Sequence, residues 1–303
     1  MFEKSRGFGG RCATRRDGPW QFDHGAQYFT VRDARLSPLI SSWQQSGLIT
    51  PWQGALAVRD NGEWQPAKAG VRRWVAMPAM NSLGAHLADG LDVQLATHVA
   101  HVQREGRQWR LVAESGADLG VFDSVLTCVP SPQAVALLAP IAPQLAHAAA
   151  SAVMHPTWAT MVVLAERPRF EWDGAFLNDD DVLSWISRNA SKPQRAVDET
   201  WVLHATRQWS TSHLEDDATQ VAGEMIAAFA TAVGSRLISV HSVAHRWRYA
   251  LPDPVTSDAA LYDATLLLGA GGDWCGGPRI EGALLSGIAL AGRVMTHAHV
   301  APV

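Results

Sequence analysis

Apolar positions along the chain follow two periods, one typical of helices and one typical of strands. In residues 33–46 they recur at i, i+3, i+4 and i+7, which predicts an amphipathic helix that buries Leu36, Leu39, Ile40 and Trp43. In residues 53–75, short strand-forming runs flank Asn61 and Gly62, a pair that favours a tight turn between two antiparallel strands. The first quarter of the chain is therefore expected to contain both kinds of element.

The same patterns predict the elements of the remaining chain. Pro78 is expected to open a helix that Gly90 closes, and Ser212 is expected to cap a helix over residues 215–233. Alternating or continuous apolar runs predict strands over residues 92–103, 107–114, 121–129, 157–165, 200–207 and 238–249. Strands and helices alternate around a β-rich middle, which predicts an α/β nucleotide-binding domain interrupted by a substrate domain.

Composition narrows the class of protein. The 303 residues carry a formal net charge of −4 and no basic patch, which argues against a nucleic-acid surface. Cys12, Cys128 and Cys275 are far apart and show no CxxC spacing, so we expect neither a disulfide framework nor a metal site. We recognise no signal peptide and no apolar run long enough for a membrane span. A cytoplasmic protein without membrane or nucleic-acid partners is expected.

Residues 264–294 are predicted to form an apolar strand, a glycine-rich turn and a helix. The turn is not a dinucleotide fingerprint, because position 274 is Trp and no acidic residue follows at the end of a second strand. It still places Asp273 at the carboxyl end of a strand, next to a helix N-terminus that favours an anionic group. The alternative is a tight turn followed by a helix whose small residues serve packing.

The N-terminal stretch "MFEKSRGFGGRCATRR" contains a second glycine-rich turn. Glu3 follows Phe2 where a strand is expected to end, and an acid in that position binds a ribose hydroxyl in dinucleotide folds. Gly9 and Gly10 allow close backbone approach, and Arg11 is suited to a phosphate. Taken alone, the stretch could equally be a flexible basic tail.

Together the two turns and the stretch "FDHGAQYF" resemble the FAD-dependent amine-oxidase-like flavoproteins, and among them most closely the bacterial renalase-type oxidoreductases. The resemblance continues through "AMPAMNSLGAHLA", "FDSVLTCVPSPQA" and "HRWRYALP", so it covers nearly the whole chain. It implies a Rossmann-like FAD-binding domain of the glutathione-reductase type over residues 1–30, 76–130 and 262–303. An inserted α+β substrate domain is implied over residues 31–75 and 131–261.

The resemblance also implies where FAD, bound non-covalently, would lie. Glu3 matches the acid that binds the adenosine ribose, and Asp273 matches the acid near the ribityl chain and the pyrophosphate. The start of the last helix is implied to point at the pyrimidine edge of the flavin. The residues implied to bind the cofactor are Glu3, Lys4, Gly9, Gly10, Arg11, Gly25, Ala26, Gln27, Val99, Gly272, Asp273, Arg279, Ile280 and Gly282.

One part of the family pattern is not found. Family members begin with a strand, a GxGxxG turn and a helix, and the acid follows that fingerprint by about 20 residues. Only two residues precede Glu3 here. We therefore expect an N-terminally incomplete FAD-binding domain with weakened affinity for FAD.

The resemblance implies transfer of a hydride from a small substrate to flavin N5, with reoxidation by O2 to H2O2. Renalase-type enzymes act on dihydronicotinamide isomers, which are flat heteroaromatic substrates. No dedicated acid or base is required, so no catalytic residue is assigned. Some of the thirteen tryptophans could wall a pocket for such a substrate, and the expected pocket residues are Tyr28, His245, Trp247 and Trp274.

Other classes of function stay open. The chain could be a truncated relative that binds flavin weakly or not at all and acts as a non-enzymatic binding protein. It could also be an amine oxidase or a desaturase-type flavoenzyme. A simple NAD-dependent dehydrogenase is disfavoured, because neither glycine-rich turn carries the fingerprint. Covalent flavin attachment at Cys275 is not expected, since "DWCGGPR" does not resemble attachment motifs.

Overall fold

The computed structural model of the protein describes residues 1–253 and 258–298. The chain divides into two compact units. Unit 1 comprises Met1–Gly7, Gly90–His155 and Leu251–Val303. Unit 2 comprises Phe8–Asp89 and Pro156–Ala250.

The compact units differ in extent from the two predicted domains. Unit 2 includes residues 8–30, which the resemblance assigned to the FAD-binding domain, and unit 1 includes residues 131–155, assigned to the substrate domain. Compactness does not show which residues surround a cofactor, so the predicted boundaries stay a prediction. Residues 254–257 and 299–303 of the predicted domains lie outside the described residues.

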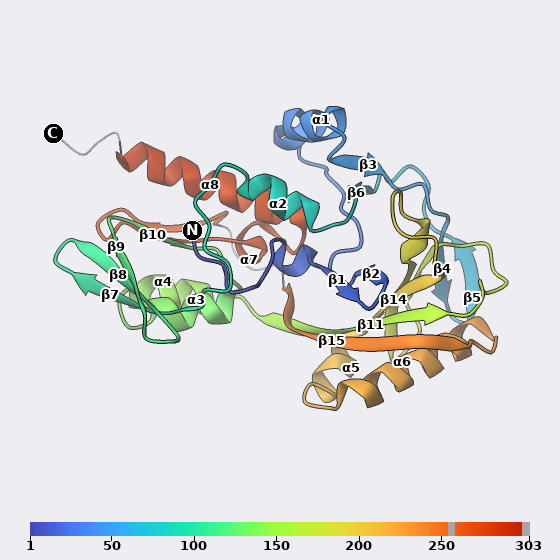
Figure 1. The fold of residues 1–303 in the computed structure, drawn as a ribbon. Coiled ribbons are helices and arrows are strands. Elements are labelled where there is room, and N and C mark those ends of the chain that lie inside the picture. The colour runs from blue at the N-terminus through green and yellow to red at the C-terminus, as the bar shows by residue number, and fades with distance from the viewer. Residues whose placement is uncertain (254–257, 299–303) are drawn as a thin grey trace. The chain divides into compact units, whose positions relative to one another are not determined.

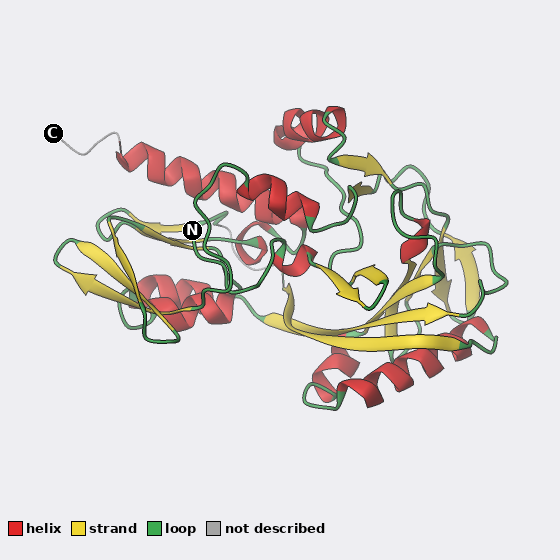
Figure 2. Cartoon of the chain, viewed as in Figure 1, coloured by secondary structure: helices red, strands yellow, loops and turns green. Residues whose placement is uncertain are grey.

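Unit 1 is built around a small parallel pair of strands. β10 pairs in parallel with β17, and β16 pairs antiparallel on the other side of β17, while β7, β8 and β9 form a separate antiparallel sheet (Figure 2). Residues of α3 and α4 share one apolar core with Trp109 and Leu268. The elements are β7 (Val99–Glu105), β8 (Gln108–Ala113), β9 (Asp118–Phe122), β10 (Val125–Thr127), α3 (Ser131–Leu138), α4 (Pro143–Ala150), β16 (Leu261–Asp263), β17 (Leu268–Ala270), α7 (Asp273–Gly276) and α8 (Ile280–Ala298).

Unit 2 is built on a seven-stranded sheet in the order β15-β11-β14-β13-β12-β4-β5. β12 and β4 pair in parallel, while the β11–β14, β14–β13, β13–β12 and β4–β5 pairs are antiparallel. Figure 1 shows α5 and α6 along one face of this sheet, where Trp201 packs with Met225 and Phe229. The strands are β1 (Thr14–Asp17), β2 (Trp20–Asp23), β3 (Ile49–Pro51), β4 (Leu56–Asp60), β5 (Glu63–Pro66), β6 (Trp74–Ala76), β11 (Met154–Leu164), β12 (Gly174–Leu177), β13 (Leu183–Arg188), β14 (Thr200–Ala205) and β15 (Ser239–Pro252). The helices are η1 (Gly10–Cys12), η2 (Ala34–Leu36), α1 (Ser37–Gln45), α2 (Ser82–Ala88), η3 (Asn189–Ser191), α5 (Arg207–Ser212) and α6 (Ala218–Val233).

Several predicted elements are confirmed. The helix predicted over residues 33–46 is present as η2 followed by α1. β4 and β5 form the predicted hairpin, and both turn residues adopt left-handed backbone, with φ 51° at Asn61 and 81° at Gly62. The final strand, glycine-rich turn and helix are present as β17, α7 and α8.

Several predicted elements are wrong in detail. The strand predicted over residues 92–103 begins only at Val99, as β7. Residues 79–81 form a turn, so α2 begins at Ser82 and not at Pro78, because the Met80 amide donates to the Asp23 carboxylate outside the helix. Ser212 ends α5, and α6 is capped by Asp217, whose carboxylate accepts two helix amides. The run over residues 121–129 is split into β9 and β10, since the two halves pair with different neighbours.

Residues 1–253 and 258–298 contain neither a membrane-spanning helix nor a cluster of metal-ligand side chains. No helix there is long and apolar enough to cross a membrane. No group of three or more His, Cys, Asp or Glu side chains in that part of the chain could hold a metal ion.

Candidate functional site

A buried carboxylate with two buried cations lies in unit 2. Asp23, the last residue of β2, is 1% exposed, and its Oδ2 accepts from Arg195 at 2.7 Å through Nη2 and at 3.1 Å through Nε. Lys192 Nζ lies 3.6 Å from the same oxygen, and its side chain is fully buried. Both cations follow η3, so an ion pair joins β2 to the segment after η3.

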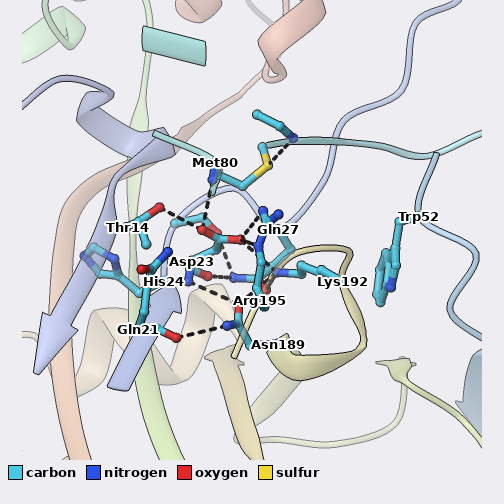
Figure 3. A network of polar contacts seen from close by, with 12 residues as sticks. Thr14, Gln21, Asp23, His24, Gln27, Trp52, Met80, Asn189, Lys192 and Arg195 are labelled. Atoms are coloured by element: carbon cyan, nitrogen blue, oxygen red, sulfur yellow. Dashed lines mark hydrogen bonds and ion pairs between the residues drawn. The ribbon is translucent and has the colours of Figure 1, made fainter. Parts of the chain in front are cut away.

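The remaining polar atoms around Asp23 are also hydrogen bonded. Its Oδ1 accepts from Thr14 Oγ1 at 2.7 Å and from the Met80 amide at 3.0 Å. Asn189 Oδ1 accepts from the Asp23 amide at 3.2 Å, and Lys192 Nζ donates to Gln27 Oε1 at 2.7 Å (Figure 3). We call this set the Asp23 network: Thr14, Asp23, Gln27, Met80, Asn189, Lys192 and Arg195.

Burial and charge set the protonation states in the Asp23 network. Burial would raise the pKa of Asp23, but the charges of Lys192 and Arg195 outweigh it and hold that pKa below its usual value. Burial, with a smaller contribution from Arg195, lowers the pKa of Lys192 from 10.5 to about 8, against the attraction of Asp23. The network therefore holds one carboxylate and an excess of positive charge at neutral pH.

Three histidines and a tryptophan lie near one another in unit 2, and one of them, His24, directly follows Asp23 in the chain. The His24 carbonyl accepts from Trp247 Nε1 and from His204 Nε2, each at 3.1 Å. The His24 ring lies 4.9 Å from that of His245 and 4.8 Å from that of Trp247, measured between centroids. We call His24, His204, His245 and Trp247 the histidine group.

The histidine group is neutral at physiological pH. Burial is the main cause that lowers the pKa of His24 to about 3 and that of His204 to about 4, and it also lowers the pKa of His245. His24 is 5% exposed, and its Nδ1 has no hydrogen-bond partner in the described part of the chain. The group thus offers aromatic faces and one unused ring nitrogen.

The predicted pocket residues are divided between different places. His245 and Trp247 lie together in the histidine group, while Tyr28 packs against Trp52 and Trp185 elsewhere in unit 2. Trp274, in unit 1, is 1% exposed and donates from Nε1 to the Val129 carbonyl, as part of the apolar core. A role for each in substrate binding stays a prediction.

The predicted cofactor residues of unit 2 gather around the Arg11 backbone. The Arg11 carbonyl accepts from the Ala26 amide at 2.9 Å, and a Cβ on Gly25 would come within 2.0 Å of that oxygen. Arg11 Nη1 donates to the Ala250 carbonyl at 2.8 Å. Gly9 and Gly10, at the start of η1, both have positive φ, 114° and 51°.

The Gln27 side chain is hydrogen bonded within unit 2. Its side chain is 5% exposed, its Nε2 donates to the Asp23 and Gly25 carbonyls, and its Oε1 accepts from Lys192. These contacts occupy the polar atoms of the amide within unit 2. The Gln27 side chain is therefore a member of the Asp23 network, and its role in cofactor binding stays a prediction.

In unit 1, Glu3 lies on an extended N-terminal segment. Phe2 forms a parallel bridge with Gln94, and the Glu3 amide donates to the Gln94 carbonyl at 2.9 Å. The Glu3 carbonyl accepts from the amide of Thr97, which lies two residues before Val99 in the chain. The Glu3 carboxylate accepts from the Ser5 amide at 2.7 Å. Lys4 is exposed.

The glycine-rich turn after β17, in unit 1, lies at the carboxyl end of a parallel strand, where open α/β sheets bind ligands. Gly272 and Asp273 begin α7 just beyond the carboxyl end of β17, which runs parallel to β10. Gly282 packs on Gly276 so closely that a Cβ on either residue would come within about 2.1 Å of backbone oxygen. Arg279 is exposed, and Ile280 is the first residue of α8.

The cations of the Asp23 network were not found from the sequence. Lys192 and Arg195 lie between two apolar strands, and no motif of the sequence marks either residue. The available signal was the polar run "RNASKPQR" between two apolar strands, which does not reveal which polar residues are buried. Burial of Lys192 and Arg195 depends on Asp23, more than 160 positions earlier in the chain.

Comparisons with known proteins identify the fold. Residues 1–42 match the family model of the NAD(P)-binding Rossmann-like domain. The chain is similar to the structure of a protein assigned as a protoporphyrinogen oxidase from Exiguobacterium sp. 255-15, with TM-score 0.74, 14% identity, and coverage of 98% of this chain and 92% of that one. It is similar to cyclohexylamine oxidase from Brevibacterium oxydans IH-35A, with TM-score 0.74, 11% identity, and coverage of 98% and 93%. A redesigned putrescine oxidase gives TM-score 0.65, 11% identity and the same coverage.

These likenesses show that the chain has a mixed α/β fold shared with solved oxidases and includes a Rossmann-like segment. Local features fit a bound dinucleotide such as FAD. Gly10 in unit 2 and Gly277 in unit 1 have positive φ and open space where a Cβ would lie, which leaves the backbone accessible there. Seven other described glycines share both properties, so the property by itself does not mark a ligand site. His24 Nδ1 supplies an unused polar atom.

Proposed function

We propose that the protein is an FAD-dependent oxidoreductase that takes a hydride from a small substrate and delivers the electrons to O2. The fold carries this proposal, because the likeness to solved oxidases extends over 98% of the chain and at least 92% of each oxidase compared above. FAD would supply the hydride acceptor and the reaction with O2 that yields H2O2, chemistry that side chains do not provide. The binding would be non-covalent.

The residues that the resemblance matches to cofactor contacts are kept as proposals, each within its own unit. In unit 1 these are the Glu3 carboxylate and the backbone at Gly272 and Asp273, at the carboxyl end of a parallel strand. In unit 2 they are the backbone of η1 at Gly9 and Gly10 and the segment Gly25–Gln27. The remaining predicted contacts, Lys4, Arg11, Val99, Arg279, Ile280 and Gly282, are kept as proposals.

The Asp23 network is proposed to fix the segment that follows β2. The segment is residues 24–27. Arg195 holds the carboxylate of Asp23, directly before the segment, and Lys192 holds the side-chain amide of Gln27 at its end. A fixed backbone keeps a bound ring system in one position relative to a substrate, which lowers the entropic cost of reaction. The neutral histidine group would add an apolar aromatic surface that excludes water.

The substrate we propose is a dihydronicotinamide, as in renalase-type enzymes. Purified protein would be loaded with FAD, freed of oxygen, and mixed with isomeric dihydronicotinamide dinucleotides, putrescine or cyclohexylamine. Bleaching of the visible flavin bands by a dihydronicotinamide, with H2O2 formed when air is admitted, is the expected result. Bleaching by the amines alone would assign the protein to the amine oxidases, and bleaching by none of these compounds would contradict the proposal.

A further inference from the structure

The last helix of unit 1, α8, which is red in Figure 1, is apolar on two opposite faces. Its inner face packs on β17, because Ser286 and Leu290 are buried and a Cβ on Gly269 would come within 2.8 Å of Leu290 Cδ1. Residues 282–292 contain no charged side chain. A helix that is apolar all round is normally covered on every side, so the outer face of α8 is expected to have a partner.

The outer face of α8 has the spacing of a coiled-coil seam. Four apolar residues follow one another at steps of four, three and four positions, which places them on the side of the helix opposite the buried face. Ile288 and Met295 are 56% and 61% exposed, although both are large and apolar, while Ala291 is exposed and Leu284 is half-buried. We call these residues the α8 seam: Leu284, Ile288, Ala291 and Met295.

The exposed apolar surface continues from α8 onto the sheet that it covers. Leu126, in β10, is 42% exposed. A Cβ on Gly269 would lie 2.8 Å from Leu290 Cδ1 and 2.9 Å from Leu126 Cδ2, so Leu126 borders α8 on the same face of the sheet. Contiguous exposed apolar surface of this kind marks an interaction site.

The composition of α8 favours a protein helix over a membrane as its partner. Helices that lie on a membrane surface carry several Lys or Arg on a polar face that stays in water. α8 contains no Lys and one Arg, Arg293, whose Nη1 donates to the Ala260 carbonyl of the same unit. The face opposite the α8 seam is buried in unit 1, so it cannot serve as that polar face.

The α8 seam is complementary to itself when two copies run antiparallel. The steps of four, three and four then place Ile288 of one copy opposite Ala291 of the other, so a large side chain meets a small one in both central layers. The acidic first turn of each helix, with Glu281, comes to lie beside the basic last turn of the other, with His297. The two helix dipoles also oppose each other, which stabilises this direction over the parallel one.

We propose that the α8 seam binds the α8 seam of a second copy of this chain, as an antiparallel pair. This inference goes beyond the proposed function and does not depend on bound flavin. One helix pair with its bordering residues buries less surface than the roughly 1,600 Å² of a standard protein–protein interface. The dimer is therefore weak and forms as the protein concentration rises.

The test measures the mass of the purified 303-residue chain by sedimentation velocity, at concentrations up to about 100 µM. We expect an equilibrium between monomer and dimer that shifts to dimer with concentration. Ile288→Glu should raise the dissociation constant of the dimer at least about tenfold, because each copy loses one buried isoleucine and gains a charge inside the seam.

Matched variants separate the α8 seam from a general change of surface. Leu91→Glu alters another leucine of unit 1 with almost the same exposure, 57% against 56% for Ile288, and should leave association unchanged. Ala291→Lys should dissociate as Ile288→Glu does. An equimolar mixture of Ile288→Glu and Ala291→Lys should recover a dimer, because the two opposite charges face each other only in the antiparallel pair. Circular dichroism checks that each variant is folded.

Each result either supports or overturns the inference. Recovery of the dimer in the mixture alone supports it, because a misfolded variant could not give that result. A wild-type chain that stays monomeric at every concentration, or folded Ile288→Glu that associates as wild type does, would overturn it. A mixture that stays monomeric would overturn the antiparallel pair. A monomeric wild-type chain that sediments with vesicles of anionic phospholipid would assign the outer face of α8 to a membrane instead.

Discussion

At the scale of single residues, Asp23 is the side chain on which the buried charges of unit 2 depend. It balances one of two cations, and the three charged side chains are each at most 1% exposed. Removing the carboxylate would leave two buried positive charges facing each other. Removing Lys192 would leave Asp23 paired with Arg195. Gln27 Oε1 would lose its donor, while Asn189 Oδ1 would lose Lys192 but still accept from the Asp23 amide.

Asp23→Asn is therefore expected to destabilise the protein more than Lys192→Met. The first change breaks a buried ion pair from its single anionic side, which costs about 3–5 kcal/mol. The second leaves one buried acceptor unsatisfied, which costs about 1–3 kcal/mol. Urea unfolding of both variants measures the difference, and a more stable Asp23→Asn variant would contradict the described charge arrangement.

The lowered pKa of Lys192 predicts a pH dependence of stability. The folded chain loses this proton near pH 8, while the unfolded chain keeps it until about pH 10.5. Between these values the unfolded chain binds more protons, so the free energy of unfolding contributed by this group rises with pH. Subtracting the unfolding profile of Lys192→Met from that of wild type should show this rise, and a flat difference from pH 8 to 10.5 would contradict it.

At the scale of elements, glycine contacts fix how α7 meets α8. A Cβ on Gly282 would lie 2.1 Å from the Gly277 carbonyl oxygen, whereas a Cβ on Gly287, five residues further along α8, meets nothing within 4 Å. The first glycine is required by packing and the second is not. Both sit in the same helix, so they form a matched pair.

Gly282→Ala is expected to lower the melting temperature, because the backbone of α7 and α8 must separate. Gly287→Ala is expected to leave it unchanged or raise it, since alanine is favoured over glycine in a helix by up to about 1 kcal/mol. Differential scanning calorimetry compares the two. Equal melting temperatures would show that the α7–α8 contact is not tight.

Elements with local signals were predictable from the sequence, while elements set by distant contacts were not. The helix over residues 33–46 follows from its own apolar spacing, and the β4–β5 hairpin follows from Asn61 and Gly62. The start of α2 was misplaced because Met80 bonds to Asp23, which is 57 positions away. Arg195 was missed for the same reason, since its partner lies 172 positions earlier.

At the scale of the whole molecule, the fold and the cofactor rest on different grounds. The fold follows from likeness to solved oxidases over nearly the full chain. The cofactor is proposed from the family resemblance, which matches Gly9, Gly10, Gly272 and Asp273 to cofactor contacts. Direct observation of bound flavin therefore tests the central claim.

The most direct measurement is a visible absorption spectrum of the purified 303-residue protein, before and after incubation with FAD and gel filtration. We predict flavin bands on the protein after incubation with FAD, in an amount that rises with FAD concentration because the expected affinity is weak. The bands should leave the protein on denaturation, because FAD is held without a covalent bond. A folded protein that emerges colourless at every FAD concentration would contradict the account, and bands that remain on the denatured chain would contradict non-covalent binding.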